Sequence, residues 1–121
     1  MTPLSVQELH NLAMNIVGEK LQEMGYEFIA VNSQLKMHPQ FVLYKKGETT
    51  IFVLVKVTSS LQESQVFDTV WMETFTQHAK QQKARVWFAG VGLANAESVE
   101  MPVFKDRPYY VAFDDFVKVL D

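Results

Sequence analysis

The run IFVLVKVTSS, Ile51–Ser60, predicts the central strand of a sheet. Every residue from Ile51 to Val57 is apolar except Lys56, and continuous apolar runs of this kind are typical of strands buried on both faces. The two-residue period of a strand places Phe52, Leu54 and Lys56 on one face. An ammonium is expensive to bury, so Lys56 either reaches solvent, meets a carboxylate or serves a function at the end of this strand.

The elements on both sides of this strand have recognisable boundaries. Ser5 and Glu8 form a capping-box pattern at the start of a helix, and Gly25 is a typical residue for its C-terminus. Ser60 and Glu63 repeat the capping-box pattern before a second helical stripe. The predicted helices cover residues 6–24, 61–83 and 114–120, the last capped by Asp114. The predicted strands cover residues 26–32, 41–44, 51–58, 85–92 and 109–113.

These elements predict an α/β fold with the order αβββαββα. The sheet is expected to be mixed and five-stranded, flanked by the two long helices. The chain has 121 residues, of which 48% are hydrophobic, and it contains no linker, repeat or low-complexity tract. We therefore expect a single domain over residues 1–121.

Composition excludes several classes of function. The chain has no cysteine, which excludes disulfides, thiolate zinc sites and cysteine-ligated iron–sulfur clusters. It has no signal-peptide pattern and no long apolar run, so a cytoplasmic location and no membrane contact are expected. The formal charge of −3 gives no general attraction for nucleic acid, which would need a local basic patch. No cofactor is predicted.

The first half of the chain resembles the PD-(D/E)XK nuclease superfamily, in particular small bacterial proteins related to Holliday-junction resolvases. The resemblance is carried by LQEMGYEFIAVN, residues 21–32, and by the hairpin that contains IFVLVKV, residues 51–57. Gly25, Tyr26 and Asn32 have the family's spacing, and Lys56 matches the lysine of its Glu-x-Lys motif. The resemblance covers roughly residues 9–58, whereas the second half agrees only in the order of its elements.

The resemblance implies a restriction-endonuclease-like fold, and it also implies which residues would carry nuclease chemistry. In such enzymes two carboxylates hold a divalent cation, which activates a water and stabilises the phosphate, while the lysine orients the nucleophile. In this chain Leu54 stands at the Glu position of the motif, Gln40 or Phe41 at the hairpin Asp, and Met14 at a helical Glu. Because these replacements cannot hold a hard cation, we expect no catalytic residues and no metal site, with Lys56 retained beside Gln40.

Two alternatives keep a nucleic-acid role open. Carboxylates from elsewhere, namely Asp68, Glu73 or Glu48, would have to approach the old site for metal-dependent cleavage to survive. Alternatively, a basic patch of Lys45, Lys46 and Lys56 would bind DNA or RNA without cleaving it. The simplest interpretation of Lys56 remains a side chain that extends its ammonium into solvent.

Other conspicuous residues are expected to serve structure. The spacing of His10, His38 and His78 contains no metal-binding motif and predicts surface or helix-face positions. Gly90 and Gly92 lack the rest of a dinucleotide fingerprint and indicate close packing or a bulge. The aromatic residues of the second helix are expected in the core rather than in a base-stacking platform. They are Phe67, Trp71 and Phe75.

The segment MPVFKDRP, residues 101–108, is the one candidate partner surface. Its apolar residues Met101, Val103 and Phe104 lie in a long irregular connection, which is often functional or packs on another chain. The alternative is a flap that covers an edge of its own sheet. With these observations, the sequence favours a non-catalytic binding or regulatory module on a degenerate nuclease-like scaffold, with a protein partner or a second copy as candidate partners.

Overall fold

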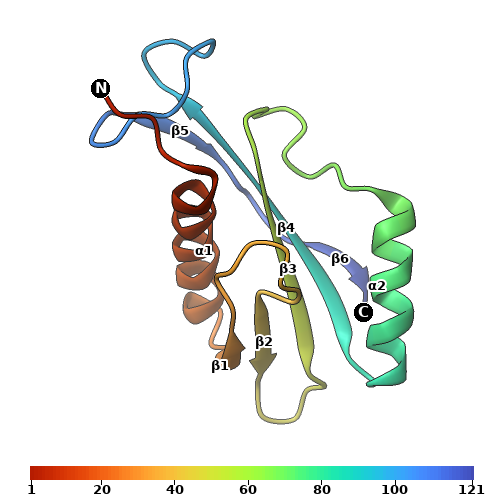
Figure 1. Ribbon diagram of the computed structural model, residues 1–121. Helices are drawn as coiled ribbons and strands as arrows, with labels where there is room; N and C mark the ends of the chain where they lie inside the picture. The colour runs from red at the N-terminus through yellow and green to blue at the C-terminus, as the bar shows by residue number, and fades with distance from the viewer.

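The computed structural model describes residues 1–121 and contains a mixed six-stranded sheet with one helix on each face (Figure 1). The helices are α1, Val6–Glu23, and α2, Thr69–Gln81. The strands are β1, Glu27–Val31; β2, Phe41–Tyr44; β3, Ile51–Thr58; β4, Arg85–Asn95; β5, Tyr109–Ala112; and β6, Val117–Leu120. The predicted α/β class and mixed sheet are therefore confirmed, with one strand more than expected.

The pairing of the strands makes β3 and β4 the centre of the sheet. The order is β1-β2-β3-β4-β5, and β6 also pairs with β4. Only β3 and β4 are parallel, and α2 lies in the connection between them, whereas all other pairs are antiparallel. The carboxyl ends of parallel strands are where open α/β sheets usually bind ligands, so the end of β3 is the place to look for a site.

Two hydrophobic cores lie on opposite faces of the sheet. Ile51, Val53 and Val55 of β3 pack with α1, whereas Phe52 and Leu54 pack with α2. All five side chains are buried, as the continuous apolar run predicts. The alternation also confirms that Lys56 shares the α2 face of the strand with Phe52 and Leu54.

The start and end of α1 agree with the sequence. The Ser5 hydroxyl accepts a hydrogen bond from the Glu8 amide at 3.1 Å, and the Glu8 carboxylate accepts one from the Ser5 amide at 2.9 Å. This hydrogen bonding also lowers the pKa of Glu8. After the helix, Gly25 has a φ of +89°, a conformation that glycine adopts at little cost. The capping box and the glycine stop are both confirmed.

The predicted third helix over residues 114–120 is wrong, because this segment forms β6. β5 pairs only with Gly92–Asn95, the carboxyl-terminal part of the long strand β4. The edge of β4 at Val86–Phe88 is therefore free for β6 to pair. Asp114 caps no helix, and the alternating sequence VKVL of β6 places its valines against the α2 core. Hydrogen bonding to the open edge of β4 therefore decides the structure of this segment over a single helix-capping residue.

The second helix begins later than predicted. Asp68 is its N-cap, and the Ser60 hydroxyl accepts a hydrogen bond from Glu63 at 3.1 Å in a turn that no helix follows. Residues 59–68 instead lie over β4, where a Cβ on Gly90 would overlap the Ser64 carbonyl oxygen. The close-packing interpretation of Gly90 is confirmed.

Neither helix combines the length and the apolar character needed to cross a lipid bilayer.

Candidate functional site

A pocket of about 320 Å³ lies along the carboxyl-terminal half of β3, on the side where α2 begins, and we call it the β3 pocket. Its polar lining residues are His10, Lys36, His38, Gln40, Lys56 and Asp68. Apolar side chains form the rest of the wall, among them Leu54, Val57, Phe67, Trp71 and Phe88. The pocket thus joins α1, the β1–β2 connection, β3 and the start of α2 around the position that the sequence singled out.

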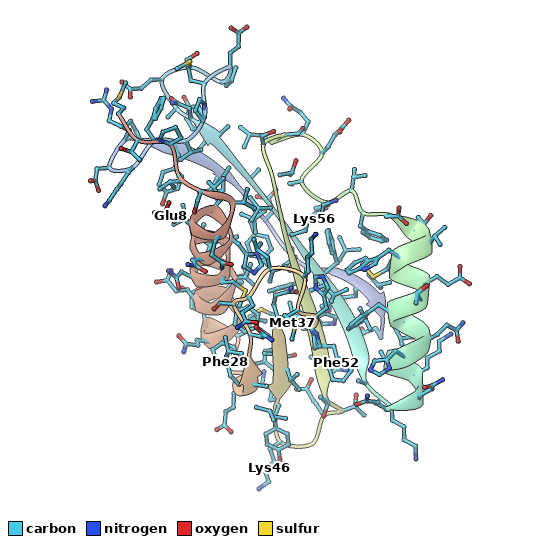
Figure 2. The ribbon with its side chains drawn as sticks, in the orientation of Figure 1. Glu8, Phe28, Met37, Lys46, Phe52 and Lys56 are labelled. Atoms are coloured by element: carbon cyan, nitrogen blue, oxygen red, sulfur yellow. The ribbon has the colours of Figure 1, made fainter.

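Lys56 is an exposed residue in the wall of this pocket. It takes part in none of the three ion pairs of the chain, so the carboxylate partner that the strand position allowed is not present. Figure 2 shows its side chain leaving the sheet on the side of α2. The ammonium therefore faces solvent and has no ion-pair partner within the protein.

Gln40 is fully buried immediately before β2 and connects the pocket to the sheet. Its Oε1 accepts a hydrogen bond from the Val55 amide at 2.8 Å. Its Nε2 lies 3.2 Å from the Met37 carbonyl oxygen and 2.7 Å from Nδ1 of His38. Because only Oε1 can accept from the Val55 amide, the orientation of the side-chain amide is fixed, and Nε2 donates to the other two groups.

The Gln40 amide in turn selects the tautomer of His38. Nδ1 of His38 accepts a hydrogen bond, so the neutral ring carries its proton on Nε2, which can donate to another group. The imidazole packs edge-on against Trp71, with ring centroids 4.9 Å apart. Trp71 is 38% exposed, so the prediction that this indole belongs to the core is wrong. It forms part of the pocket wall instead.

His10 is the buried polar residue of the pocket. Its side chain lies on a face of α1, which is one of the two positions expected for it, and it is 4% exposed rather than at the surface. Its Nε2 is buried and has no hydrogen-bond partner in the protein. Burial lowers the pKa of His10 below its ordinary value, and the neighbouring His38 adds to this effect. An unpaired buried nitrogen of this kind is uncommon in proteins.

Asp68 is the only carboxylate in the wall of the β3 pocket, and it already has a structural role. Its Oδ1 accepts a hydrogen bond from the Trp71 amide at 2.9 Å and so caps α2. Glu73 is exposed on α2 and does not line the pocket. No group of three or more acidic, histidine or cysteine side chains in the chain is arranged to bind a metal ion.

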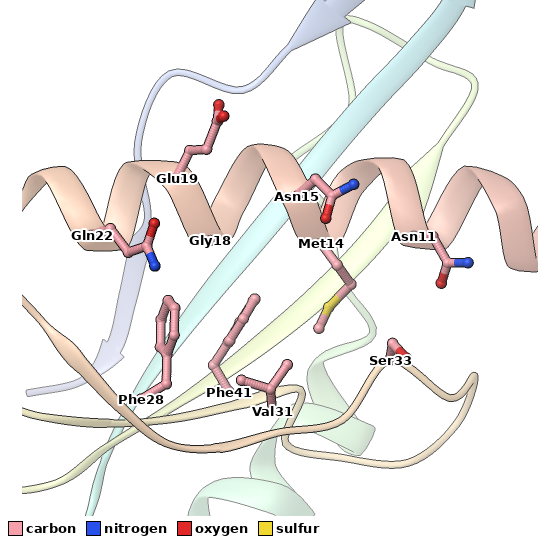
Figure 3. Close-up of a pocket in the computed structure, with 10 residues that line it drawn as sticks. All are labelled: Asn11, Met14, Asn15, Gly18, Glu19, Gln22, Phe28, Val31, Ser33 and Phe41. Carbon is pink, nitrogen blue, oxygen red and sulfur yellow. The ribbon is translucent and has the colours of Figure 1, made fainter.

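The positions that the nuclease resemblance singled out divide between the two faces of the sheet. Gln40 and Leu54 both line the β3 pocket, so they are the pair that faces Lys56. Phe41 and Met14 line a separate groove of about 590 Å³ between α1 and β1 (Figure 3). Phe41 and Met14 therefore do not share a pocket with Lys56 and Leu54.

The groove between α1 and β1 has a different chemistry from the β3 pocket. Its helix side presents Asn11, Asn15, Gln22 and Glu19, and its floor is formed by aromatic and aliphatic side chains (Figure 3). It contains one carboxylate and no cationic side chain. This groove therefore offers neither the lysine nor the histidines that distinguish the β3 pocket.

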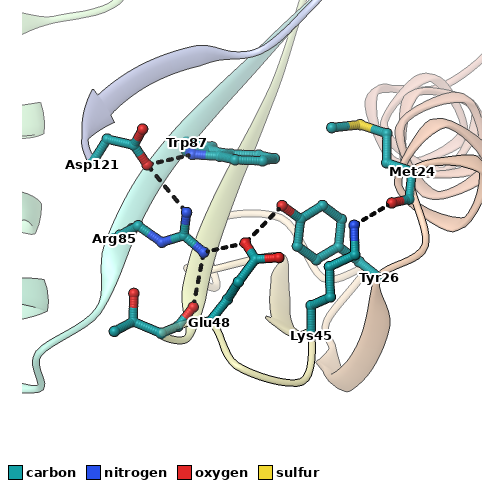
Figure 4. Close-up of polar contacts among 8 residues, drawn as sticks. Met24, Tyr26, Lys45, Glu48, Arg85, Trp87 and Asp121 are labelled. Atoms are coloured by element: carbon teal, nitrogen blue, oxygen red, sulfur yellow. Dashed lines mark hydrogen bonds and ion pairs between the residues drawn. The ribbon is translucent and has the colours of Figure 1, made fainter.

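Lys45, Lys46 and Glu48 lie at the other end of β3, in the hairpin that precedes it. The Lys45 ammonium donates to the Met24 carbonyl oxygen at 2.7 Å (Figure 4). Glu48 pairs with Arg85 at 3.2 Å, so it is not free to rebuild a site beside Lys56. Figure 2 shows Lys46 at the tip of the hairpin, far along the sheet from Lys56. The three lysines do not form one patch.

The hairpin end carries its own polar cluster, shown in Figure 4. Arg85 joins Glu48 to Asp121, at 3.2 Å and 3.3 Å respectively. The Tyr26 hydroxyl reaches Glu48 at 3.4 Å, and burial together with this carboxylate raises the pKa of Tyr26. These contacts tie the chain's last residue to the hairpin and indicate a structural cluster.

Two of the three apolar residues of the candidate partner segment are covered by their own chain. Val103 and Phe104 are 6% and 8% exposed, and Val103 belongs to the α1 core. The Leu4 amide donates to the Val103 carbonyl oxygen at 2.9 Å, so the N-terminal segment pairs with this connection. Of these three apolar residues only Met101 is exposed, so they do not form an open apolar surface.

Comparison with known proteins identifies the family of the chain. The family model described as "Domain of unknown function (DUF8840)" matches residues 7–119. Since this match covers nearly the whole chain, the protein belongs to that family. No curated protein and no solved structure matches it. The site must therefore be interpreted from its own residues.

Proposed function

We propose that this protein is a non-catalytic binding or regulatory module on a degenerate nuclease-like scaffold, and that the β3 pocket is its binding site. The observation that carries the proposal is the exposed Lys56 in a pocket whose one carboxylate, Asp68, is engaged in capping α2. A lysine without a carboxylate partner can attract a ligand but cannot hold a cation for hydrolysis.

The two replaced positions beside Lys56 support binding rather than cleavage. Leu54 is 1% exposed and packs in the α2 core, where it offers no metal ligand. Gln40 uses its single side-chain oxygen on the Val55 amide. Both positions therefore serve the packing of β3, and the open space beside them remains available to a ligand. The cytoplasmic location, which the lack of cysteine favours, stays a prediction.

The two tryptophans provide an internal test of this proposal. Trp71 lines the β3 pocket, whereas Trp87 is 2% exposed and packs in the α1 core. We would screen small neutral, anionic and cationic aromatic fragments by ¹⁵N NMR. A binder in the pocket is expected to shift the Trp71 indole resonance and to leave that of Trp87 in place. If no fragment of any charge shifts Trp71 selectively, the pocket is not a binding site.

A second assay compares binding with cleavage. Wild-type protein and Lys56→Ala are incubated with branched and duplex DNA in Mn²⁺. No cleavage is expected at high protein concentration, because the pocket lacks a set of acidic ligands. Cleavage that disappears in Lys56→Ala would overturn the non-catalytic proposal. DNA binding whose affinity falls steeply with salt would instead identify the ligand as nucleic acid.

A further inference from the structure

The charges around the β3 pocket are opposite in sign to those of the whole chain. The chain has 14 acidic against 11 basic side chains. The pocket, in contrast, has Lys36 and Lys56 in its wall with Asp68 as its one carboxylate. Lys56 has no ion-pair partner in the protein, and Asp68 is already hydrogen bonded to the Trp71 amide. The local field therefore favours an anion.

The hydrogen-bonding groups of the pocket include two histidines with different surroundings. His38 accepts from Gln40 through Nδ1, which leaves the Nε2 proton of the neutral ring available as a donor. His10 is more than nine-tenths buried, lines the pocket, and has an Nε2 without any partner. A ligand that supplies an oxygen acceptor would pair with the Nε2 proton of His38.

The remaining walls define the body of the ligand. Leu54, Phe67, Trp71 and Phe88 present aliphatic and aromatic surface. The pocket volume of about 320 Å³ is at the small end of the range of about 300–1,000 Å³ for ligand pockets. This size admits a small molecule, not a nucleic-acid duplex. The indole of Trp71 stacks on Phe75 and is held edge-on by His38, so it is a firm wall for a planar group.

We infer that the β3 pocket binds a small amphiphilic anion. The anionic group, a carboxylate or a phosphate, lies against Lys56 and His38, and an aromatic or branched aliphatic body lies between Trp71 and Leu54. This inference rests on the proposed function, since it names the ligand class of the same site.

Four matched probes test the inference on the full chain. Phenylacetate carries a carboxylate, phenylacetamide is its neutral counterpart, phenethylamine is its cationic counterpart, and phenyl phosphate replaces the carboxylate by a phosphate. Binding is followed by the Trp71 indole resonance, with Trp87 as the internal control. The anions are expected to bind about tenfold more tightly than the neutral amide, as hydrogen bonds to charged groups allow. The stronger of the two anions identifies carboxylate or phosphate as the preferred group.

A matched pair of variants assigns this preference to Lys56. Lys56→Gln removes the charge at an exposed position and is expected to abolish most of the preference for the anion. Lys46→Gln removes an exposed lysine at the hairpin tip, outside the pocket, and is expected to leave all four affinities unchanged.

The outcomes separate this inference from the proposed function. If phenylacetamide or phenethylamine binds as tightly as the anions, the anionic ligand class is wrong while the pocket remains a binding site. If Lys56→Gln keeps the wild-type preference for the anions, the placement of the anionic group against Lys56 is wrong. If none of the four probes and no fragment in the wider screen shifts Trp71, the proposed function itself fails.

Discussion

The Gln40 side chain is expected to stabilise the fold through its contact with β3, and Gln40→Leu tests this. Leucine has a similar size but cannot accept from the Val55 amide, which lies in a fully buried part of β3. A buried amide left unpaired costs about 1–3 kcal/mol, and losing the donors to Met37 and His38 costs about 1 kcal/mol more. We expect the free energy of unfolding to fall by about 2–4 kcal/mol.

Urea denaturation followed by circular dichroism measures this change. The midpoint is expected to fall while the m-value stays the same, because the surface exposed on unfolding is unchanged. Gln65→Leu is the control, since Gln65 is exposed and its amide donates a single hydrogen bond to the Asp115 carbonyl oxygen. The control should change stability by less than about 0.5 kcal/mol. A loss below about 1 kcal/mol in Gln40→Leu would refute the reasoning that β3 depends on this side chain.

Two further predictions concern a buried base and a pair of glycines. Because folding lowers the pKa of His10, its contribution to stability is present above the ordinary value of about 6.5 and is lost as the pH falls through the lowered value. The free energy of unfolding should therefore decrease less between pH 7 and pH 5 in His10→Leu than in the wild type. The exposed control His78→Leu should show the same decrease as the wild type. Equal slopes in wild type and His10→Leu would contradict this. Gly90→Ala should destabilise by about 1–3 kcal/mol or more because its Cβ would overlap the Ser64 carbonyl. In Gly18→Ala the new Cβ would meet Phe41 at an ordinary 3.6 Å, so this variant should stabilise α1 by about 0.5–1 kcal/mol. Thermal melts in which both glycine variants change stability in the same direction would contradict this packing.

Sequence patterns predicted those helices and strands whose ends depend on contacts between residues close together in the chain. The Ser5 capping box and Gly25 define α1 through contacts within a few residues, so both could be read from the sequence. The apolar run of β3 likewise predicts its burial on both faces. The third helix failed for the opposite reason. Whether residues 117–120 form a strand depends on the unpaired edge of β4, some thirty residues earlier in the chain.

The site shows the same division between local and distant information. Lys56 and its face of β3 follow from the two-residue period of a strand. The neighbours of Lys56 come from α1, the β1–β2 connection and α2, and no spacing in the sequence brings His10, His38 and Trp71 together. His38 offered a weak signal, because its ring lies two residues from Gln40, which was itself singled out. The unpaired Nε2 of His10 could be found only once the packing of α1 was known.

On the proposed nuclease-like scaffold, the residues at positions 40 and 54 decide whether the site can hydrolyse a phosphate or can only bind one. A nuclease centre binds its phosphate through a cation held by carboxylates, and hydrolysis requires that cation. Here the amide of Gln40 holds the Val55 amide and orients His38, while Leu54 extends the α2 core. Removing the carboxylates also removes the negative charge that would repel an anion from Lys56. On that proposal, the same two substitutions account both for the loss of cleavage and for the recognition of an anion through Lys56.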